Sequence, residues 1–251
     1  FVLGLGLWIE KPKVKSFLIP ILLLNAIALV LTNSRNAWAI AVLVSLAFAL
    51  YQGWKWIVAG VGAIAAVMLG AAFAPAPVST GLRVIVPAFF WARLNDQMYS
   101  DRPFAQLRST QWKFAWSMTQ QRPLTGWGLR SFTELYNTQM RYWLGHPHNL
   151  FLMLSAETGL IVTLLFYGLV GWVMAQGVLQ CRLETGVNRL WLFTFLMAFA
   201  ACTLFSVLDV TLFDARNNLM GWVLLAGICG LTPLTYCDRA IDEAANRTGF
   251  G

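Results

Sequence analysis

Apolar residues divide the chain into six long runs and one long polar segment. A helix needs about 20 apolar residues to cross the hydrocarbon core of a membrane, and in lipid its backbone polar groups must bond within the helix. The pattern therefore predicts an all-α, polytopic integral membrane bundle. The first two runs are short, so we expect their helices to extend into the flanking polar residues. The expected spans lie at about 16–33, 37–52, 54–74, 149–179, 190–208 and 217–236.

Composition agrees with this class. The 251 residues are 58% hydrophobic and 12% charged, whereas soluble domains carry roughly 25% charged residues. The chain starts at Phe1, and its first residues look like the tail of an apolar segment. We expect residues 1–251 to form a single membrane domain, the C-terminal part of a longer chain. The four cysteines are scattered and favour neither a disulfide framework nor a metal site.

The basic residues of the short loops predict the orientation. Two of them, Arg35 and Arg216, fall on one side of the predicted bundle. Short cytoplasmic loops carry an excess of Lys and Arg, so the richer side should be cytoplasmic and the 75–148 segment should be a long external loop. The richer side holds eight basic residues, namely Lys11, Lys13, Lys15, Lys55, Arg182, Arg189, Arg239 and Arg247.

The 75–148 loop is itself strongly basic, with eight Lys and Arg residues against three Asp and Glu residues. A positive surface beside a membrane attracts phosphate or diphosphate groups. Anionic lipid in general would be attracted in the same way. Within the loop, residues 104–120 show helical spacing of apolar positions, which predicts an amphipathic helix on the bilayer with Trp112 and Trp116 at head-group level.

The chain has only two histidines, His146 and His148, where the loop meets the fourth apolar run. Asn149 can cap the helix that follows. A neutral imidazole at a membrane boundary can act as a general base, although a histidine after Pro147 could also serve only to bond within a turn. Spacing alone does not choose between His146 and His148.

Two charged residues border or enter the apolar runs. Arg35 could clamp a phosphate in a bidentate manner or could simply mark a helix end by snorkelling. Glu157 follows His148 by nine residues, which places it about half a turn from the His148 face and about 13.5 Å along the helix. It should not orient His148 directly. An intramembrane function and a hydrogen bond between helices remain open for Glu157.

Other chemistry lacks support in the sequence. Two histidines with few nearby carboxylates do not predict a metal site, and no cofactor is expected. The Gly-x-Gly dipeptides lack the strand-then-helix context of a nucleotide loop, and no motif suggests a nucleic-acid partner.

Several motifs together resemble the O-antigen ligase and polymerase family of bacterial membrane glycosyltransferases. The strongest is His148-Asn149 followed after nine residues by Gly159; the departure is Val162, where the family usually has Gly, Thr or Tyr. Residues 34–38 (SRNAW) resemble Ser-Arg-Gly-Ala-Trp, with Asn36 in place of Gly.

Two more motifs lie in the loop. Arg108 followed by Trp112 resembles Arg-x-x-x-Trp, and residues 122–128 (RPLTGWG) with the later Phe132 and Tyr136 resemble a Pro-Leu-x-Gly-x-Gly turn. The four motifs fall in family order, and the resemblance covers roughly residues 16–234. The tryptophan-rich loop and the residues before His148 are most similar to a cyanobacterial branch named for inorganic-carbon accumulation.

The resemblance implies a metal-independent transferase of the bacterial inner membrane, as in lipopolysaccharide or other polysaccharide biosynthesis. A glycan on an undecaprenyl-diphosphate carrier would pass to a hydroxyl of a lipid or glycan acceptor on the periplasmic face. His148 would take the hydroxyl proton. The substrate-binding residues would be Arg35, Arg108, Arg122, Arg141, His146 and Asn149. The rival hypotheses are a bicarbonate transporter or transport-associated protein, and a non-catalytic membrane scaffold.

Overall fold

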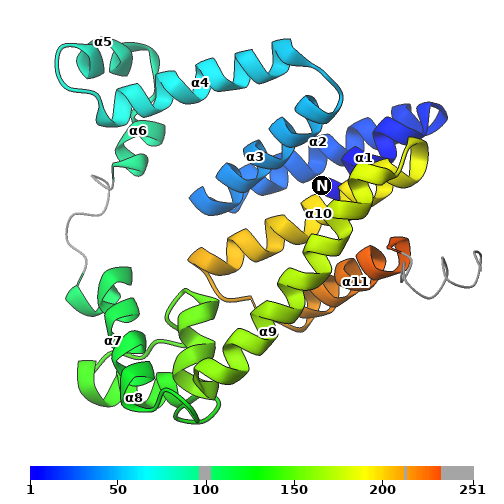
Figure 1. Cartoon of the computed structure of the whole chain (residues 1–251). Coiled ribbons are helices and arrows are strands. Elements are labelled where there is room, and N and C mark those ends of the chain that lie inside the picture. The colour runs from blue at the N-terminus through cyan, green and yellow to red at the C-terminus, as the bar shows by residue number, and fades with distance from the viewer. Residues whose placement is uncertain (96–102, 212–213, 233–251) are drawn as a thin grey trace, which may run out of the picture.

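The structure is a computed structural model that describes residues 1–95, 103–211 and 214–232 (Figure 1). The described residues form helices without strands, which confirms the all-α membrane class. The helices are α1 (Val2–Glu10), α2 (Lys15–Leu31), α3 (Arg35–Tyr51), α4 (Lys55–Phe73), α5 (Val78–Ile85), α6 (Ala88–Leu94), α7 (Arg108–Gln121), α8 (Ser131–Met140), α9 (Leu150–Leu183), α10 (Gly186–Leu208) and α11 (Ala215–Leu231), with 3-10 turns η1 (Pro12–Val14) and η3 (Phe104–Gln106).

Helix α10 lies at the centre of the bundle and packs against α1, α3, α9 and α11. Leu192 and Leu196 of α10 meet Ile228 of α11 in one buried apolar cluster. Large apolar side chains also face outward, for example Leu165, which is 69% exposed. An apolar exterior around an apolar core is what a bilayer requires.

Three of the described helices are long and apolar enough to cross a membrane, namely α4, α9 and α10. Helices α2 and α3 are apolar but have 17 residues each, or about 25 Å at 1.5 Å per residue. The two helices start slightly before their predicted spans, at Lys15 and Arg35, and end slightly before the predicted residues, so the extension into flanking polar residues is small. The exact membrane spans stay a prediction.

Helices α4 to α6 form an arm at one side of the bundle (Figure 1). Helix α4 packs against α3, α5 and α6. The Arg83 guanidinium donates to the Ala71 carbonyl at 2.8 Å and lies over the Trp91 ring at 4.2 Å. This basic residue of the loop therefore holds the arm together.

Helices α7 and α8 form a lobe on the first part of α9. Phe114, Phe132, Tyr136 and Ala156 are the centre of its buried core. The sequence prediction of one helix over 104–120 is wrong at its start, because Pro103 begins a 3-10 turn and Leu107 is extended, so α7 begins at Arg108.

The buried face of α7 also differs from the predicted apolar stripe. Trp116, assigned to that stripe, is 42% exposed, whereas polar side chains are buried against the protein. A head-group position for Trp112 and Trp116 stays a prediction. The buried residues of α7 are Thr110, Gln111, Phe114, Ala115, Met118 and Thr119.

Helix α9 is broken at Gly159, where the backbone has φ +84° and ψ +165°. The 123–128 loop fills the break. The N–H groups of Trp127 and Gly128 donate to the carbonyls of Ala156 and Glu157 at 3.0 and 2.9 Å, and the Leu160 N–H donates to the Pro123 carbonyl at 2.7 Å. Backbone groups freed inside an apolar helix must find partners, and this loop supplies them.

Two glycines make this contact possible. A methyl group on Gly159 would overlap the carbonyl of Leu124, and one on Gly126 would overlap the carbonyl of Glu157. Both residues also have a positive φ, a conformation that costs other residues energy. The Gly-rich turn in the loop and the glycine in the helix are therefore two halves of one contact.

We predict that Gly159→Ala destabilises the protein by about 3 kcal/mol or more, because it adds backbone strain and a steric overlap. Gly168→Ala is the matched control, since this residue of the same helix has nothing within 4 Å of an added Cβ. Thermal unfolding in detergent measures the difference. Equal melting temperatures for the two variants would contradict the prediction.

Candidate functional site

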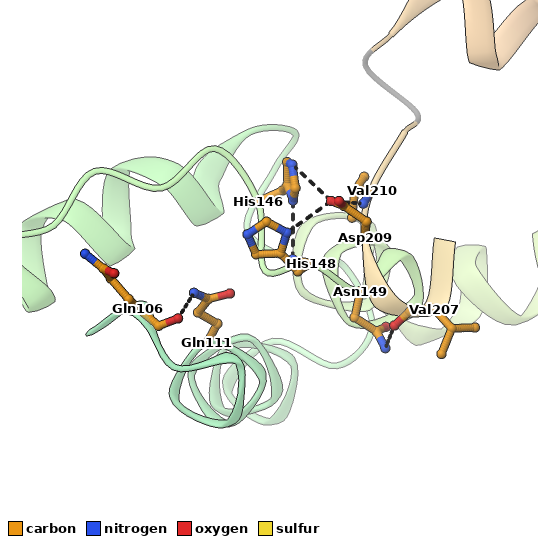
Figure 2. Close-up of polar contacts among 8 residues, drawn as sticks. All are labelled: Gln106, Gln111, His146, His148, Asn149, Val207, Asp209 and Val210. Carbon is orange, nitrogen blue, oxygen red and sulfur yellow. Dashed lines mark hydrogen bonds and ion pairs between the residues drawn. The ribbon is translucent and has the colours of Figure 1, made fainter. Parts of the chain in front are cut away.

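The start of α9 and the end of α10 meet at a cluster of His146, His148 and Asp209 (Figure 2). Asn149 brings the two helices together. Its Oδ1 accepts from the Leu152 N–H at 2.9 Å, which confirms the predicted cap, and its Nδ2 donates to the Val207 carbonyl at 3.0 Å. Asp209 follows α10 directly, so this tie sets its carboxylate beside the His148 ring.

Helix α8 holds the histidine segment from the other side. The Thr133 hydroxyl donates to the Gly145 carbonyl at 3.0 Å, and Pro147 is fully buried. His148 has φ +52°, a left-handed conformation that is uncommon for a residue with a side chain. Such strain persists only where the surroundings impose it, and it concentrates at functional sites.

The distances in the cluster are those of a hydrogen-bonded dyad with a third member. His148 Nδ1 lies 3.0 Å from Asp209 Oδ1, and His146 Nε2 lies 3.8 Å from the same oxygen. The two imidazole rings meet edge to face with centroids 4.6 Å apart. Asp209 Oδ1 also accepts from the Val210 N–H at 2.8 Å.

These contacts assign the protons of both rings. A carboxylate accepts only, so in the neutral ring His148 Nδ1 carries the hydrogen and Nε2 has the lone pair. His146 Nδ1 accepts from the His148 backbone N–H at 3.3 Å, so in the neutral ring its Nε2 carries the hydrogen, on the side of Asp209. His148 therefore presents a basic nitrogen on the edge of its ring away from Asp209 (Figure 2).

The electrostatics follow from burial and from these bonds. Burial lowers the pKa of His146, the neighbouring His148 lowers it further, and Asp209 offsets this only in part, so its pKa lies below the ordinary 6.5. Burial raises the pKa of Asp209, but hydrogen bonds from His148 and Val210 and the nearby histidines outweigh it, so its pKa lies below 3.8. Near neutral pH the cluster thus holds a carboxylate beside a neutral His146.

The cluster also has the composition of a metal site, since one donor atom from each of the three side chains lies within 4.8 Å of the others. The sequence argument that few carboxylates lie near the histidines is wrong, because Asp209 comes from 61 residues away. A metal-bound histidine normally donates its other ring N–H. His146 Nδ1 instead accepts a backbone N–H, so the hydrogen bonds suit an acid–base dyad better than an ion.

Arg35 lies beside Arg93 at the turn between α2 and α3. The Arg35 guanidinium donates to the Arg93 carbonyl, and the Arg93 guanidinium donates to the Asn33 carbonyl at 2.5 Å. Arg93 also lies 5.9 Å over the Trp38 ring. Two guanidinium groups are therefore held near each other at one end of the bundle, an arrangement suited to anions.

The other predicted arginines lie on the α7–α8 lobe. Arg108 starts α7 and Arg122 ends it, which separates them by about 20 Å of helix. Arg122 stacks on the Trp127 ring at 4.1 Å, and Arg141 ends α8 in a left-handed conformation. Substrate binding by Arg35, Arg108, Arg122 and Arg141 stays a prediction.

Glu157 serves the architecture. It is 3% exposed, its Oε1 accepts from the Phe132 N–H at 3.4 Å, and the Arg130 backbone also bonds to it. These donors belong to the start of α8, so the carboxylate caps that helix and satisfies its dipole. Of the two alternatives left open by the sequence, the hydrogen bond between helices is the one that the contacts support.

Asp209 is the site residue that sequence reasoning missed. One signal was available: it is the carboxylate at the outer end of the fifth apolar run, on the same predicted side of the membrane as His148. Asp209 is far from His148 along the chain, and helical spacing predicts proximity only for residues of the same helix.

The comparison with family models finds a match to O-antigen ligase over residues 20–167. This range covers more than half of the chain and includes Arg35, Arg108, His148 and Gly159. The chain belongs to the O-antigen ligase family. Searches of curated proteins and of solved structures find no match.

Membership in the O-antigen ligase family indicates a membrane protein that carries out glycan transfer of the O-antigen ligase type. In general terms, its substrates are a lipid-linked glycan and an acceptor. The matched range ends before Asp209, so the structure, and not the family match, identifies Asp209 as the partner of His148. The cyanobacterial branch suggested by the sequence stays a prediction.

We predict that the protein loses stability as the pH falls from about 7 to 5. The unfolded chain protonates His146 near pH 6.5, whereas the folded chain does so only at lower pH. Stability from neutral His146 is therefore fully present above the unfolded pKa and is lost as the pH falls through the folded pKa. Thermal unfolding in detergent across this range should show a smaller loss for His146→Gln, and an equal or larger loss would contradict the assignment.

Proposed function

We propose that this protein transfers a glycan from an undecaprenyl-diphosphate carrier to a hydroxyl of a lipid or glycan acceptor at the periplasmic face of a bacterial inner membrane. The observation that carries the proposal is the His148–Asp209 hydrogen bond of 3.0 Å, which leaves His148 Nε2 free to accept a proton. The excess of basic residues on the opposite side supports the external position.

In this mechanism the acceptor hydroxyl donates to His148 Nε2. As its oxygen bonds to the anomeric carbon of the donor sugar, the proton moves to the imidazole and the bond from that carbon to the diphosphate oxygen breaks. Undecaprenyl diphosphate leaves with the electron pair. Asp209 stabilises the imidazolium that forms, as the carboxylate does in other His–Asp pairs.

The leaving diphosphate gains negative charge, which arginines can stabilise without a metal ion. Arg35 is the leading candidate, because its neighbour Arg93 holds a second guanidinium nearby. Arg108 is the second candidate, because it lies exposed at the start of α7, where the helix dipole also favours anions.

We predict that His148→Ala lowers glycan transfer by about 100-fold or more, the usual contribution of a general base. Asp209→Asn should give a loss of similar order, because the amide reverses the bond that fixes the His148 tautomer. Transfer of a labelled glycan in proteoliposomes, run in EDTA, measures both.

Inactivity of the wild-type protein in EDTA would instead favour a metal at the three-residue cluster. Unchanged transfer by His148→Ala would overturn the proposed function, and bicarbonate uptake above that of empty vesicles would then favour the transport alternative.

We predict that Arg35→Lys lowers transfer by about tenfold or more, because lysine is a point charge that lacks the bidentate fork of arginine. Arg182→Lys, near the opposite end of α9, is the matched control and should leave transfer unchanged. Initial rates at several donor concentrations measure the effect. Equal rates for the two variants would mean that Arg35 only marks the helix end.

A further inference from the structure

Gln111 has an unused hydrogen-bond acceptor inside the α7–α8 lobe. The side chain is 2% exposed, and its Nε2 donates to the Gln106 carbonyl at 3.1 Å. Its Oε1 is buried and has no hydrogen-bond partner among the residues that the structure describes. The bond to Gln106 also fixes the amide orientation, because a flipped amide would set two oxygens against each other.

Helix α7, which carries Gln111, packs against α9, which begins two residues after His148. Near the end of α7, the Thr119 hydroxyl lies 3.1 Å from the Ser155 hydroxyl. Gln111 and Thr119 belong to the same buried face and are eight residues apart. Ser155 lies five residues after the start of α9 at Leu150, and the histidine segment directly precedes that start.

Helix α8 gives independent support for this position. The Tyr136 hydroxyl donates to the Ala105 carbonyl at 2.6 Å, next to Gln106, and the Thr133 hydroxyl donates to the Gly145 carbonyl, next to His146. Thr133 and Tyr136 are one turn apart, so both segments attach to the same part of α8. Figure 2 shows the Gln111 amide on the side of the His148 ring that faces away from Asp209.

A buried amide oxygen without a partner is unfavourable, and such a group in a native structure calls for a reason. A ligand hydroxyl is a suitable reason here, because hydrogen bonds at active sites often close only when the substrate binds. The reacting hydroxyl has one hydrogen, which it gives to His148 Nε2. A second hydroxyl of the same substrate can then donate to Gln111 Oε1.

We propose that Gln111 Oε1 accepts a hydrogen bond from the hydroxyl adjacent to the reacting one, so that the acceptor is a sugar presenting two neighbouring hydroxyls. This inference rests on the proposed function and narrows its acceptor class. A serine or threonine side chain of a protein carries one hydroxyl and leaves Gln111 unpaired. A site built to bond a hydroxyl rejects an analogue that lacks it, because the buried partner is then left without a bond.

The test compares two acceptors, an alkyl hexoside with a free vicinal diol and its analogue in which the neighbouring hydroxyl is replaced by hydrogen. In proteoliposomes with the lipid-linked donor, we expect the wild-type protein to prefer the diol by about 100-fold in kcat/KM. Gln111→Met should use both acceptors at about the rate that the wild-type protein shows with the deoxy analogue. Gln120→Met, on the exposed face of the same helix, should keep the full preference.

Three results would overturn the inference. The first is an unchanged preference for the diol in Gln111→Met, and the second is an equal loss of transfer by this variant with both acceptors, which indicates a structural role. The third is wild-type transfer to a serine peptide or a simple alcohol as fast as to the diol. A wild-type protein that uses neither hexoside also counts against it. These failures are separate from failure of the proposed function, which would show as transfer that does not depend on His148.

Discussion

The broken backbone of α9 is the constraint on which the rest of the structure depends. Ala156, Glu157 and Leu160 bond to the 123–128 loop instead of to their own helix, and Gly159 gives the loop room to approach. This contact fixes where α7 ends and where α8 begins. Helix α8 then holds both η3 and the histidine segment, so the geometry of the site is set from the break outward.

The polar residues within the apolar part of α9 hold these elements together. The residues of the proposed chemistry lie at the start of the helix. Glu157 caps α8, and Ser155 meets Thr119. Asn149 uses both atoms of its amide to cap α9 and to hold α10, and in the proposed reaction it acts by placing Asp209. Of the two histidines, His148 keeps an uncommitted ring nitrogen in this assignment, which is why we propose the acid–base role for it.

The sequence predicted the class of the fold well, because apolar runs of membrane length have few other outcomes. It also predicted the cap at Asn149 and located the histidines at a helix start. It failed where distant segments meet. Asp209 joins the histidines through helix packing, as Gln111 does in our proposal, and no spacing within one helix reveals such contacts. The 104–120 stripe was misread because α7 buries polar residues against protein, so its pattern mixes two environments. The sequence did not predict the break in α9, because its apolar run has the pattern of one continuous helix.

The order of synthesis gives the break at Gly159 a further consequence. The 123–128 loop emerges from the ribosome before α9, so the partners of Ala156, Glu157 and Leu160 exist before those groups enter the membrane. The segment around Gly159 is apolar, and without the loop it could form an unbroken helix. The break at Gly159 is therefore satisfied only in the docked structure, where the loop supplies the partners of the freed backbone groups.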